Sequence, residues 1–220
     1  DCFQFFLAVG GARDNRFMTR TPSRTVAALR LAAHRLGRGG QDPADVLGGV
    51  LALQAQDYVA GLQATALRGS GMTASTVARS LDRGELVRTW PMRGTLHLLR
   101  PDDLAWLLPL GRDRVHRSAA GRHRQLGLAE TDFERAAAAA RLRLDGGRAT
   151  RAEVLAAIGE AGVATTGQRG AHLLGALARN AVVVQATKDV YVDFDAVVPT
   201  TELSRSEALG RLALRYVAGH

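Results

Sequence analysis

Two glutamines, Gln54 and Gln56, stand two residues apart in the segment L-A-L-Q-A-Q-D-Y-V-A-G (51–61), between apolar runs. A pair of neutral amides can hold a water molecule or the edge of a base. The alternative is that they cap backbone groups or face solvent, as such polar side chains often do. On a regular helix residues i and i+2 point to opposite sides, so the amides converge only where the helix is interrupted. Asp57 suits the N-cap of a following helix, and we therefore place both glutamines in a helix–turn–helix corner.

The segments around this corner carry helix start signals. Thr21-Pro22 and Asp42-Pro43 each put a capping residue before a proline at the first helical position. Thr73 follows two glycines and suits the start of another helix. A compact helical group is therefore expected on both sides of the two glutamines.

After this group the sequence pattern changes from helical to extended. E-L-V-R-T-W (85–90) and T-L-H-L-L (95–99) are short runs of strand formers, separated by the turn P-M-R-G, and this indicates a hairpin. A hairpin that follows a helix–turn–helix group is the order of a winged helix, in which the hairpin is the wing. A helix starting at Pro101 then leads into a strongly basic helical stretch (111–124).

The same order of elements recurs in the second half. Thr131 with Glu134, Thr150 with Glu153 and Ser204 with Glu207 have capping-box spacing. The second box is followed by a helix from about Thr166 to Arg179 and then by a hairpin made of V-V-V-Q-A and V-Y-V-D-F. The third box is followed by a last helix.

We therefore predict a mostly helical α+β protein built from tandem winged helix–turn–helix units and truncated at the start of a third. The expected divisions are an N-terminal extension of no assigned role (1–17), a first winged-helix unit with its following helices (18–145), a second unit (146–200) and the first helix of an incomplete third unit (201–220).

The charge and composition of the chain restrict the kinds of partner that it can bind. The chain has 29 Lys and Arg against 21 Asp and Glu, a net charge of +8, which favours a polyanion over an acidic small molecule. The single cysteine, Cys2, excludes an internal disulfide and a cysteine-based zinc site. The sequence shows no metal-ligand spacing, no glycine-rich phosphate loop and no apolar run long enough for a membrane span. We expect no cofactor, no metal, no membrane association, a cytoplasmic location and, for the full-length form, a monomer.

The wing is a candidate nucleic-acid contact. Arg93 and Gly94 at its tip suit insertion of an arginine into a minor groove or against a phosphate, although a solvated turn has the same sequence. Thr95 and His97 share one face of the second strand and could meet DNA, whereas a single histidine is more often structural. Tyr58 could stack on a base or belong to the core.

Further candidates lie on helices. Gln168 and Arg169 begin the helix in the second half that corresponds to a recognition helix, where base or phosphate contacts are expected. The basic stretch could track DNA phosphates or be a solvated helix face; its members are Arg112, Arg114, Arg117, Arg122, His123 and Arg124.

The motif T-W-P-M-R-G-T-L-H-L-L-R-P-D-D-L (89–104), with L-Q-A-Q-D upstream, resembles the tandem winged-helix DNA glycosylases of the AlkZ/YcaQ type. The later segments V-V-V-Q-A and Y-V-D-F-D-A-V-V-P also fit, and the resemblance spans about Thr21 to His220, the N-terminal two-thirds of such a protein. A Gln-x-Gln motif marks the AlkZ-like branch of that family, and Gln54-Ala55-Gln56 matches it. The resemblance thus implies double-stranded DNA as partner and Gln54 and Gln56 as catalytic residues.

The chemistry implied for two glutamines is hydrolysis of an N-glycosidic bond through an oxocarbenium-like transition state. A purine alkylated at N7 or N3 already carries positive charge and leaves without protonation, so the amides need only position a water. N7-alkylguanine and interstrand crosslinks are the expected substrates. The alternatives are a non-catalytic winged-helix DNA binder, such as a transcriptional regulator, and a protein-interaction module with an incidental basic surface.

Overall fold

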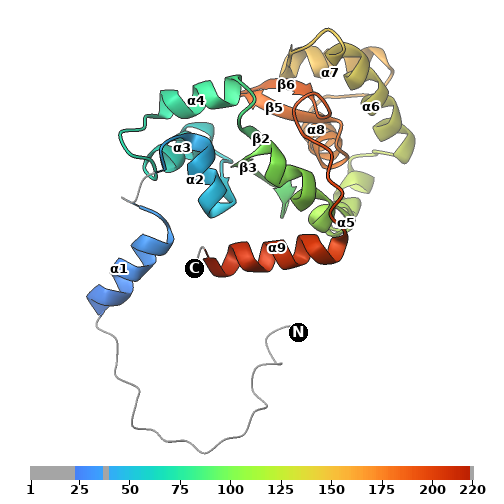
Figure 1. The fold of residues 1–220 in the computed structure, drawn as a ribbon. Coiled ribbons are helices and arrows are strands. Elements are labelled where there is room, and N and C mark those ends of the chain that lie inside the picture. The colour runs from blue at the N-terminus through green and yellow to red at the C-terminus, as the bar shows by residue number, and fades with distance from the viewer. Residues whose placement is uncertain (1–22, 37–39, 219–220) are drawn as a thin grey trace, which may run out of the picture.

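The computed structural model describes residues 23–36 and 40–218; the expected helix start at Thr21-Pro22 and the extension over residues 1–17 lie outside them. The helices are α1 (Ser23–Ala33), α2 (Pro43–Val50), α3 (Tyr58–Ala66), α4 (Ala74–Asp82), α5 (Pro101–Gln125), α6 (Glu130–Leu144), α7 (Arg151–Glu160), α8 (Arg169–Arg179) and α9 (Arg205–Ala218) (Figure 1). The strands are β1 (Ala52–Gln54), β2 (Val87–Met92), β3 (Thr95–Leu99), β4 (Ala149–Thr150), β5 (Val183–Thr187) and β6 (Val190–Asp193). The expected α+β class is confirmed.

One antiparallel sheet contains both expected hairpins. Among the described residues its strand order is β1-β3-β2-β5-β6-β4, and the hairpins are β2–β3 and β5–β6. They meet where Arg88 of β2 lies opposite Gln185 of β5. At the β2–β3 turn Arg93 and Gly94 both have positive φ, 53° and 73°, which suits a two-residue turn that follows the strand twist. The two halves of the chain therefore share one sheet.

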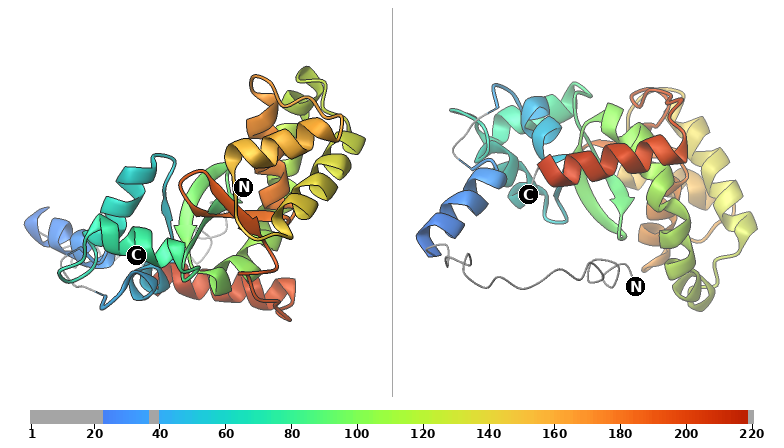
Figure 2. Two further views of the ribbon diagram at one scale, coloured as in Figure 1. Left: turned by 90° about the horizontal axis from the view of Figure 1, so that it is seen from above. Right: turned by 60° about the horizontal axis from the view of Figure 1, so that its bottom comes forward.

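Helices α2, α3 and α4 form a first helical group beside β1 and β3. Their core contains Leu47, Val77 and Leu98, all fully buried. The expected caps are confirmed, because Asp42 accepts a hydrogen bond from the Asp45 N–H at 2.8 Å and Thr73 is the N-cap of α4. In both views of Figure 2 this group (blue to teal) lies at one end of the molecule, and the yellow and orange helices lie at the other.

Helix α5 links the two ends. The apolar helix expected after Pro101 and the basic stretch that follows it are one continuous helix of 25 residues. Its first half packs on the sheet through Leu104, Trp106 and Leu107. Pro109, inside the helix, is on its exposed side. One helix therefore carries a core-forming half and a basic half.

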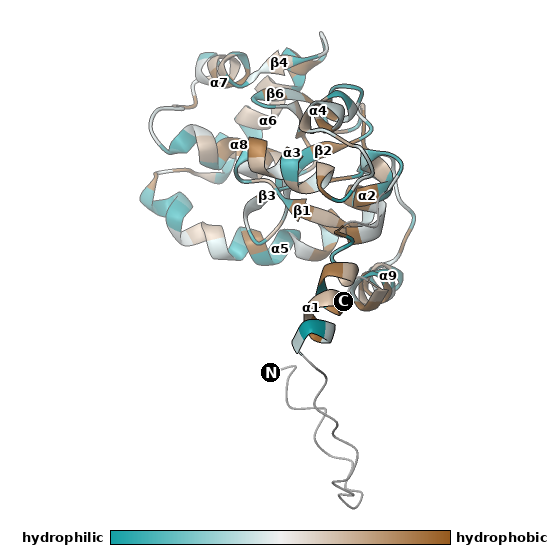
Figure 3. Cartoon of the chain, turned by 90° about the vertical axis from the view of Figure 1, so that its left-hand side faces the viewer, coloured by the Kyte–Doolittle hydropathy of each residue, from teal (hydrophilic) through white to brown (hydrophobic). Residues whose placement is uncertain are grey.

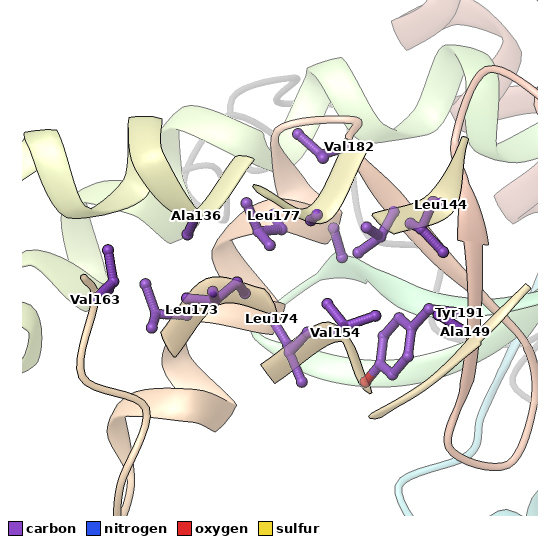
Figure 4. Packing of buried hydrophobic residues seen from close by; sticks show 14 of the residues in the cluster. Ala136, Leu144, Ala149, Val154, Val163, Leu173, Leu174, Leu177, Val182 and Tyr191 are labelled. Carbon is purple, nitrogen blue, oxygen red and sulfur yellow. The ribbon is translucent and has the colours of Figure 1, made fainter. Parts of the chain in front are cut away.

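The second helical group packs α6, α7 and α8 against β5 and β6. Figure 4 shows Ala136 of α6, Val154 of α7, Leu173 of α8 and Tyr191 of β6 converging in this core. Each of these side chains is fully buried, and burial of one large apolar side chain contributes about 1.5–3 kcal/mol.

Of the three expected capping boxes in the second half, two are confirmed. Thr150 and Glu153 exchange the two expected bonds at the start of α7, and Ser204 and Glu207 do so before α9. The box assigned to Thr131 and Glu134 is wrong. Helix α6 starts earlier, at Glu130, and the carboxylate of Asp132 accepts a hydrogen bond from the N–H of its N-cap, Ala129 (3.0 Å).

Helix α9 crosses the outer side of α5 and α2. Arg215 donates a hydrogen bond to Asp103 of α5 (3.2 Å) and another to the carbonyl of Gly48 (2.5 Å). Figure 3 shows hydrophobic residues (brown) on both α1 and α9, the helices drawn at the bottom of that view. Within the described ranges, the helices are too short or too polar to cross a membrane.

Candidate functional site

Gln54 and Gln56 lie at an edge of the sheet, so their predicted place in a helix–turn–helix corner is wrong. Helix α2 ends at Val50, and Leu51 has φ 70° and ψ −60°, the dihedrals of a rare and strained γ-turn. The chain then continues as the edge strand β1, in which Gln54 lies opposite His97 of β3. The predicted interruption between helices exists, but pairing with β3 extends it into a strand.

Gln54 is the last residue of β1, and Gln56 lies two residues further on, in the bend before α3. Gln54 and Gln56 are exposed, and Ala55 between them is 1% exposed. A Cβ added to Gly61 would lie 2.5 Å from the Ala55 Cβ, so α3 packs directly against this backbone. The inward position of Ala55 thus leaves both amides facing outward.

The two amides differ in what holds them. The Leu96 N–H donates to Oε1 of Gln56 at 3.2 Å, which ties this side chain to the wing strand. The Gln54 amide forms no hydrogen bond with any residue in the described part of the chain. The pair therefore consists of one anchored amide and one that is available to a ligand.

Arg88 holds the backbone under these side chains, and sequence reasoning missed it. Its Nε donates to the Ala55 carbonyl (2.9 Å) and its Nη2 to the Gln56 carbonyl (3.2 Å). Its Nη1 donates to Oε1 of Gln185 (2.5 Å), and Nε2 of Gln185 donates to the Tyr191 hydroxyl (2.8 Å). Arg88 is only 5% exposed. A buried guanidinium thus connects the glutamine segment to the second half of the sheet.

Tyr58 belongs to the same arrangement. The Arg88 guanidinium carbon lies 5.6 Å from the centre of the Tyr58 ring, a cation–π distance. Burial lowers the pKa of Arg88, and the nearby tyrosine and aspartate groups oppose this effect. The ring is partly buried and packs against the first helical core, which fits the packing alternative for Tyr58.

His97 is next to Gln54 in the sheet but is not on the surface. It is 2% exposed, and its Nδ1 donates to the Thr95 carbonyl at 2.9 Å. Burial lowers the pKa of His97, so the neutral ring is favoured, with Nε2 as an acceptor. This environment fits the structural alternative. Thr89 of β2 lies opposite His97 and is fully buried, and its hydroxyl forms no hydrogen bond among the described residues.

A family model described as DNA glycosylase AlkZ-like matches residues 47–220. The chain belongs to this AlkZ-like family. A curated relative, an interstrand DNA cross-link repair glycosylase of Streptomyces sahachiroi, is 39% identical over 66 residues, which are 30% of this chain and 18% of that protein. The solved structure of the DNA glycosylase AlkZ from the same organism is similar with a TM-score of 0.70 and 25% identity, over 89% of this chain and 56% of that one. The chain thus spans about half the length of the solved relative.

The β2–β3 hairpin of this AlkZ-like chain lies along α5. A Cβ on Gly111 would be 3.2 Å from the Pro91 carbonyl, and one on Gly94 would be 4.0 Å from Val115. Arg93 and Gly94 at the tip are exposed. Thr95 is partly buried, and its hydroxyl has no hydrogen-bond partner within the described residues.

The basic half of α5 exposes a series of arginines, with Arg112 and Arg114 among them; the others are Arg117, Arg122 and Arg124. Arg122 reaches the start of α8, where its Nη2 donates to Oε1 of Gln168 at 2.6 Å. The structure therefore brings Gln168 to the basic surface of α5.

Arg169 of the AlkZ-like chain is engaged inside the fold. Its Nε donates to the Ala164 carbonyl (2.8 Å) and its Nη1 to the Gly127 carbonyl (3.0 Å), and its Nη2 is 3.5 Å from a carboxylate oxygen of Asp132. These contacts fix the α5–α6 connection to the start of α8. Across residues 23–36 and 40–218, no group of three or more His, Cys, Asp or Glu side chains could hold a metal ion.

Proposed function

We propose that this protein hydrolyses the N-glycosidic bond of cationic alkylated purines in duplex DNA, with Gln54 and Gln56 positioning the attacking water. The observation that carries the proposal is the pair of outward-facing amides at the sheet edge, one free and one anchored, in a chain of the AlkZ-like family. The relative named as an interstrand DNA cross-link repair glycosylase makes N7-alkylguanine and crosslinked purines the substrates to test.

The charge of the proposed substrate follows from the role of Asp57, the carboxylate next to Gln56 in the sequence. The adjacent carboxylate, Asp57, accepts the Ala60 N–H at 2.8 Å as the N-cap of α3, the role that its position in the sequence indicates. An amide is too weak an acid to protonate a leaving base. A purine that already carries positive charge departs with the electron pair of the broken C1′–N bond and becomes neutral. The water oxygen bonds to C1′, and its proton passes to solvent.

The DNA surface in this proposal consists of the wing tip and the basic half of α5, in a winged-helix arrangement. Arg93 extends from the turn of the wing, and Arg112 and Arg114 are exposed on the helix that packs beside it. In this proposal Arg169 stabilises the fold and does not contact DNA, because its guanidinium is bound to partners within the protein. Contacts of this kind neutralise phosphates, so the binding constant should fall steeply with salt.

The decisive experiment measures abasic sites formed in duplex DNA that carries one N7-methylguanine. We expect product with this duplex at a rate above spontaneous depurination, and none with an undamaged duplex of the same sequence. A folded, intact protein that binds DNA with a strong salt dependence but releases no base would instead be a non-catalytic DNA binder.

Asp57 offers a test of the acid-free mechanism. Asp57→Ala is expected to lower the free energy of unfolding by about 1 kcal/mol, because the cap of α3 is lost. Asp57→Asn should retain both stability and base release, since asparagine also caps helices and the carboxylate has no role as an acid. Urea unfolding and the abasic-site assay measure the two properties. A stable Asp57→Asn protein without activity would contradict the mechanism.

A further inference from the structure

Arg179, at the end of α8, is a buried cation without a counter-ion. It is 6% exposed, its Nε has no hydrogen-bond partner, and it forms no ion pair with any residue in the described part of the chain. Burial alone lowers the pKa of Arg179, to about 10, so the side chain stays charged near neutral pH. Burying an unpaired charge is costly unless a partner or ligand compensates for it. The fold alone supplies no such compensation.

A cavity lies between α5, α6 and α8. Its volume is about 300 Å³, at the lower end of the range for small-ligand sites. It is lined by His116, Arg117, Ala120, His123, Glu130, Phe133, Ala176 and Asn180. Arg179 is not in the lining itself, but it directly precedes Asn180 in the sequence. Burial lowers the pKa values of both cavity histidines, and the Arg179 charge lowers them further.

Two further polar atoms at this cavity are unsatisfied. The Nε2 atoms of His116 and His123 are buried and have no hydrogen-bond partner among the described residues. The His123 ring packs against Phe133 (4.9 Å between centroids) and His172 (5.4 Å), and these contacts fix its position. Buried polar atoms are rarely left unpaired, and here three occur close to one cavity.

The charged groups at or near the cavity are Arg112, Arg117 and Arg179 on the positive side and Asp113 and Glu130 on the negative side. Arg117 is on the α5 side and Glu130, on α6, supplies the one carboxylate of the lining. Within the described part of the chain, Glu130 forms no hydrogen bond or ion pair with the histidines or with Arg179, and it is exposed. Burial is the main cause that lowers the pKa of His123 to about 4, so the ring is neutral near pH 7. An anion is the ligand that would satisfy both the guanidinium and the ring N–H groups.

We propose that this cavity binds one phosphate group, with His116 and His123 as hydrogen-bond donors and Arg179 as the counter-charge. The phosphate could belong to a DNA strand, because exposed arginines continue along α5 from Arg117, or to a free phosphate compound. Only the DNA source depends on the function proposed above. The phosphate site itself does not.

The test is thermal unfolding of the intact protein in sodium phosphate and in sodium chloride of equal ionic strength, with NMR of the histidine rings as a second readout. A tenfold excess of phosphate over its Kd should raise Tm by about 3–6 °C and shift the His116 and His123 resonances. Arg179→Met should abolish both effects without lowering Tm in chloride, because it removes an uncompensated buried charge. Arg79→Met, the same change on the exposed side of α4, should leave both effects intact.

Equal Tm values in phosphate and chloride, with unchanged histidine resonances, would overturn the proposal, and so would a phosphate response that survives in Arg179→Met. If Arg179→Met does not fold, His123→Phe replaces it in the test. The proposal then requires that His123→Phe lose the phosphate response. DNA binding then identifies the source. If a strand phosphate occupies the site, Arg179→Met reduces the slope of log K against log salt by about 1. An unchanged slope, with phosphate binding present, assigns the site to a free phosphate compound.

Discussion

Gln54→Ala and Gln56→Ala are each expected to lower base release from N7-methylguanine DNA by about 10²-fold or more, while DNA affinity is preserved. The reason is geometric. Both side chains face outward at the end of β1, and loss of either amide leaves the water with one partner. Abasic-site formation under single-turnover conditions measures the chemical step, and a binding titration with undamaged duplex measures affinity.

The two variants should differ in stability. Gln56→Ala removes the acceptor of the Leu96 N–H and should cost about 1 kcal/mol, whereas Gln54→Ala removes no bond within the described chain. Gln63→Ala is the matched control, because Gln63 is an exposed glutamine on α3; it should leave base release unchanged. A double variant, Gln54→Ala with Gln56→Ala, that forms as much product as the unaltered protein would disprove the catalytic assignment.

Elements with local start and stop signals could be predicted from the sequence. Asp42, Thr73 and Thr150 each begin a helix as expected, because a cap acts on the N–H groups of its own first turn. The hairpins also follow from local patterns, since their strands are separated by two-residue turns. These features need no information from the rest of the chain.

Strand β1 could not be predicted in this way. The chain leaves α2 at Leu51, which adopts positive φ where glycine is the residue usually found. The strand has three residues, and its partner β3 lies more than 40 positions later. Both the break and the pairing are therefore imposed by tertiary contacts. Both glutamines are nevertheless exposed, because Ala55 between them takes the buried position.

The roles of Arg88 and Arg169 were also hidden in the sequence. In E-L-V-R-T-W an arginine among strand formers resembles a solvent-facing residue, but Arg88 is buried where the two halves of the sheet meet. Its hydrogen bond to Gln185 joins residues 97 positions apart. Arg169 likewise contacts the α5–α6 connection, more than 40 positions away. Only the assembled fold shows that these charges have internal partners.

Arg88→Met is therefore the substitution with the largest expected effect on stability, about 3 kcal/mol in the free energy of unfolding. It leaves the Ala55 and Gln56 carbonyls and the Gln185 amide without their donor, and unpaired buried acceptors cost about 1–3 kcal/mol each. Removal of the desolvated guanidinium offsets part of this sum. Urea unfolding measures the change, and Arg79→Met on the exposed side of α4 controls for the lost charge.

The same variant should lose base release even at temperatures where it remains folded, because Arg88 fixes the backbone that carries both amides. We expect kcat to fall by about 10-fold or more, with the KM for DNA little changed, as for a group that positions a catalytic residue. Gln185→Met removes one of the three acceptors of Arg88, together with the donor to the Tyr191 hydroxyl, and leaves the bonds to the glutamine segment in place. It should therefore lower kcat less than Arg88→Met does. If folded Arg88→Met protein turned over as fast as Arg79→Met, the backbone of the glutamine segment would not need this support.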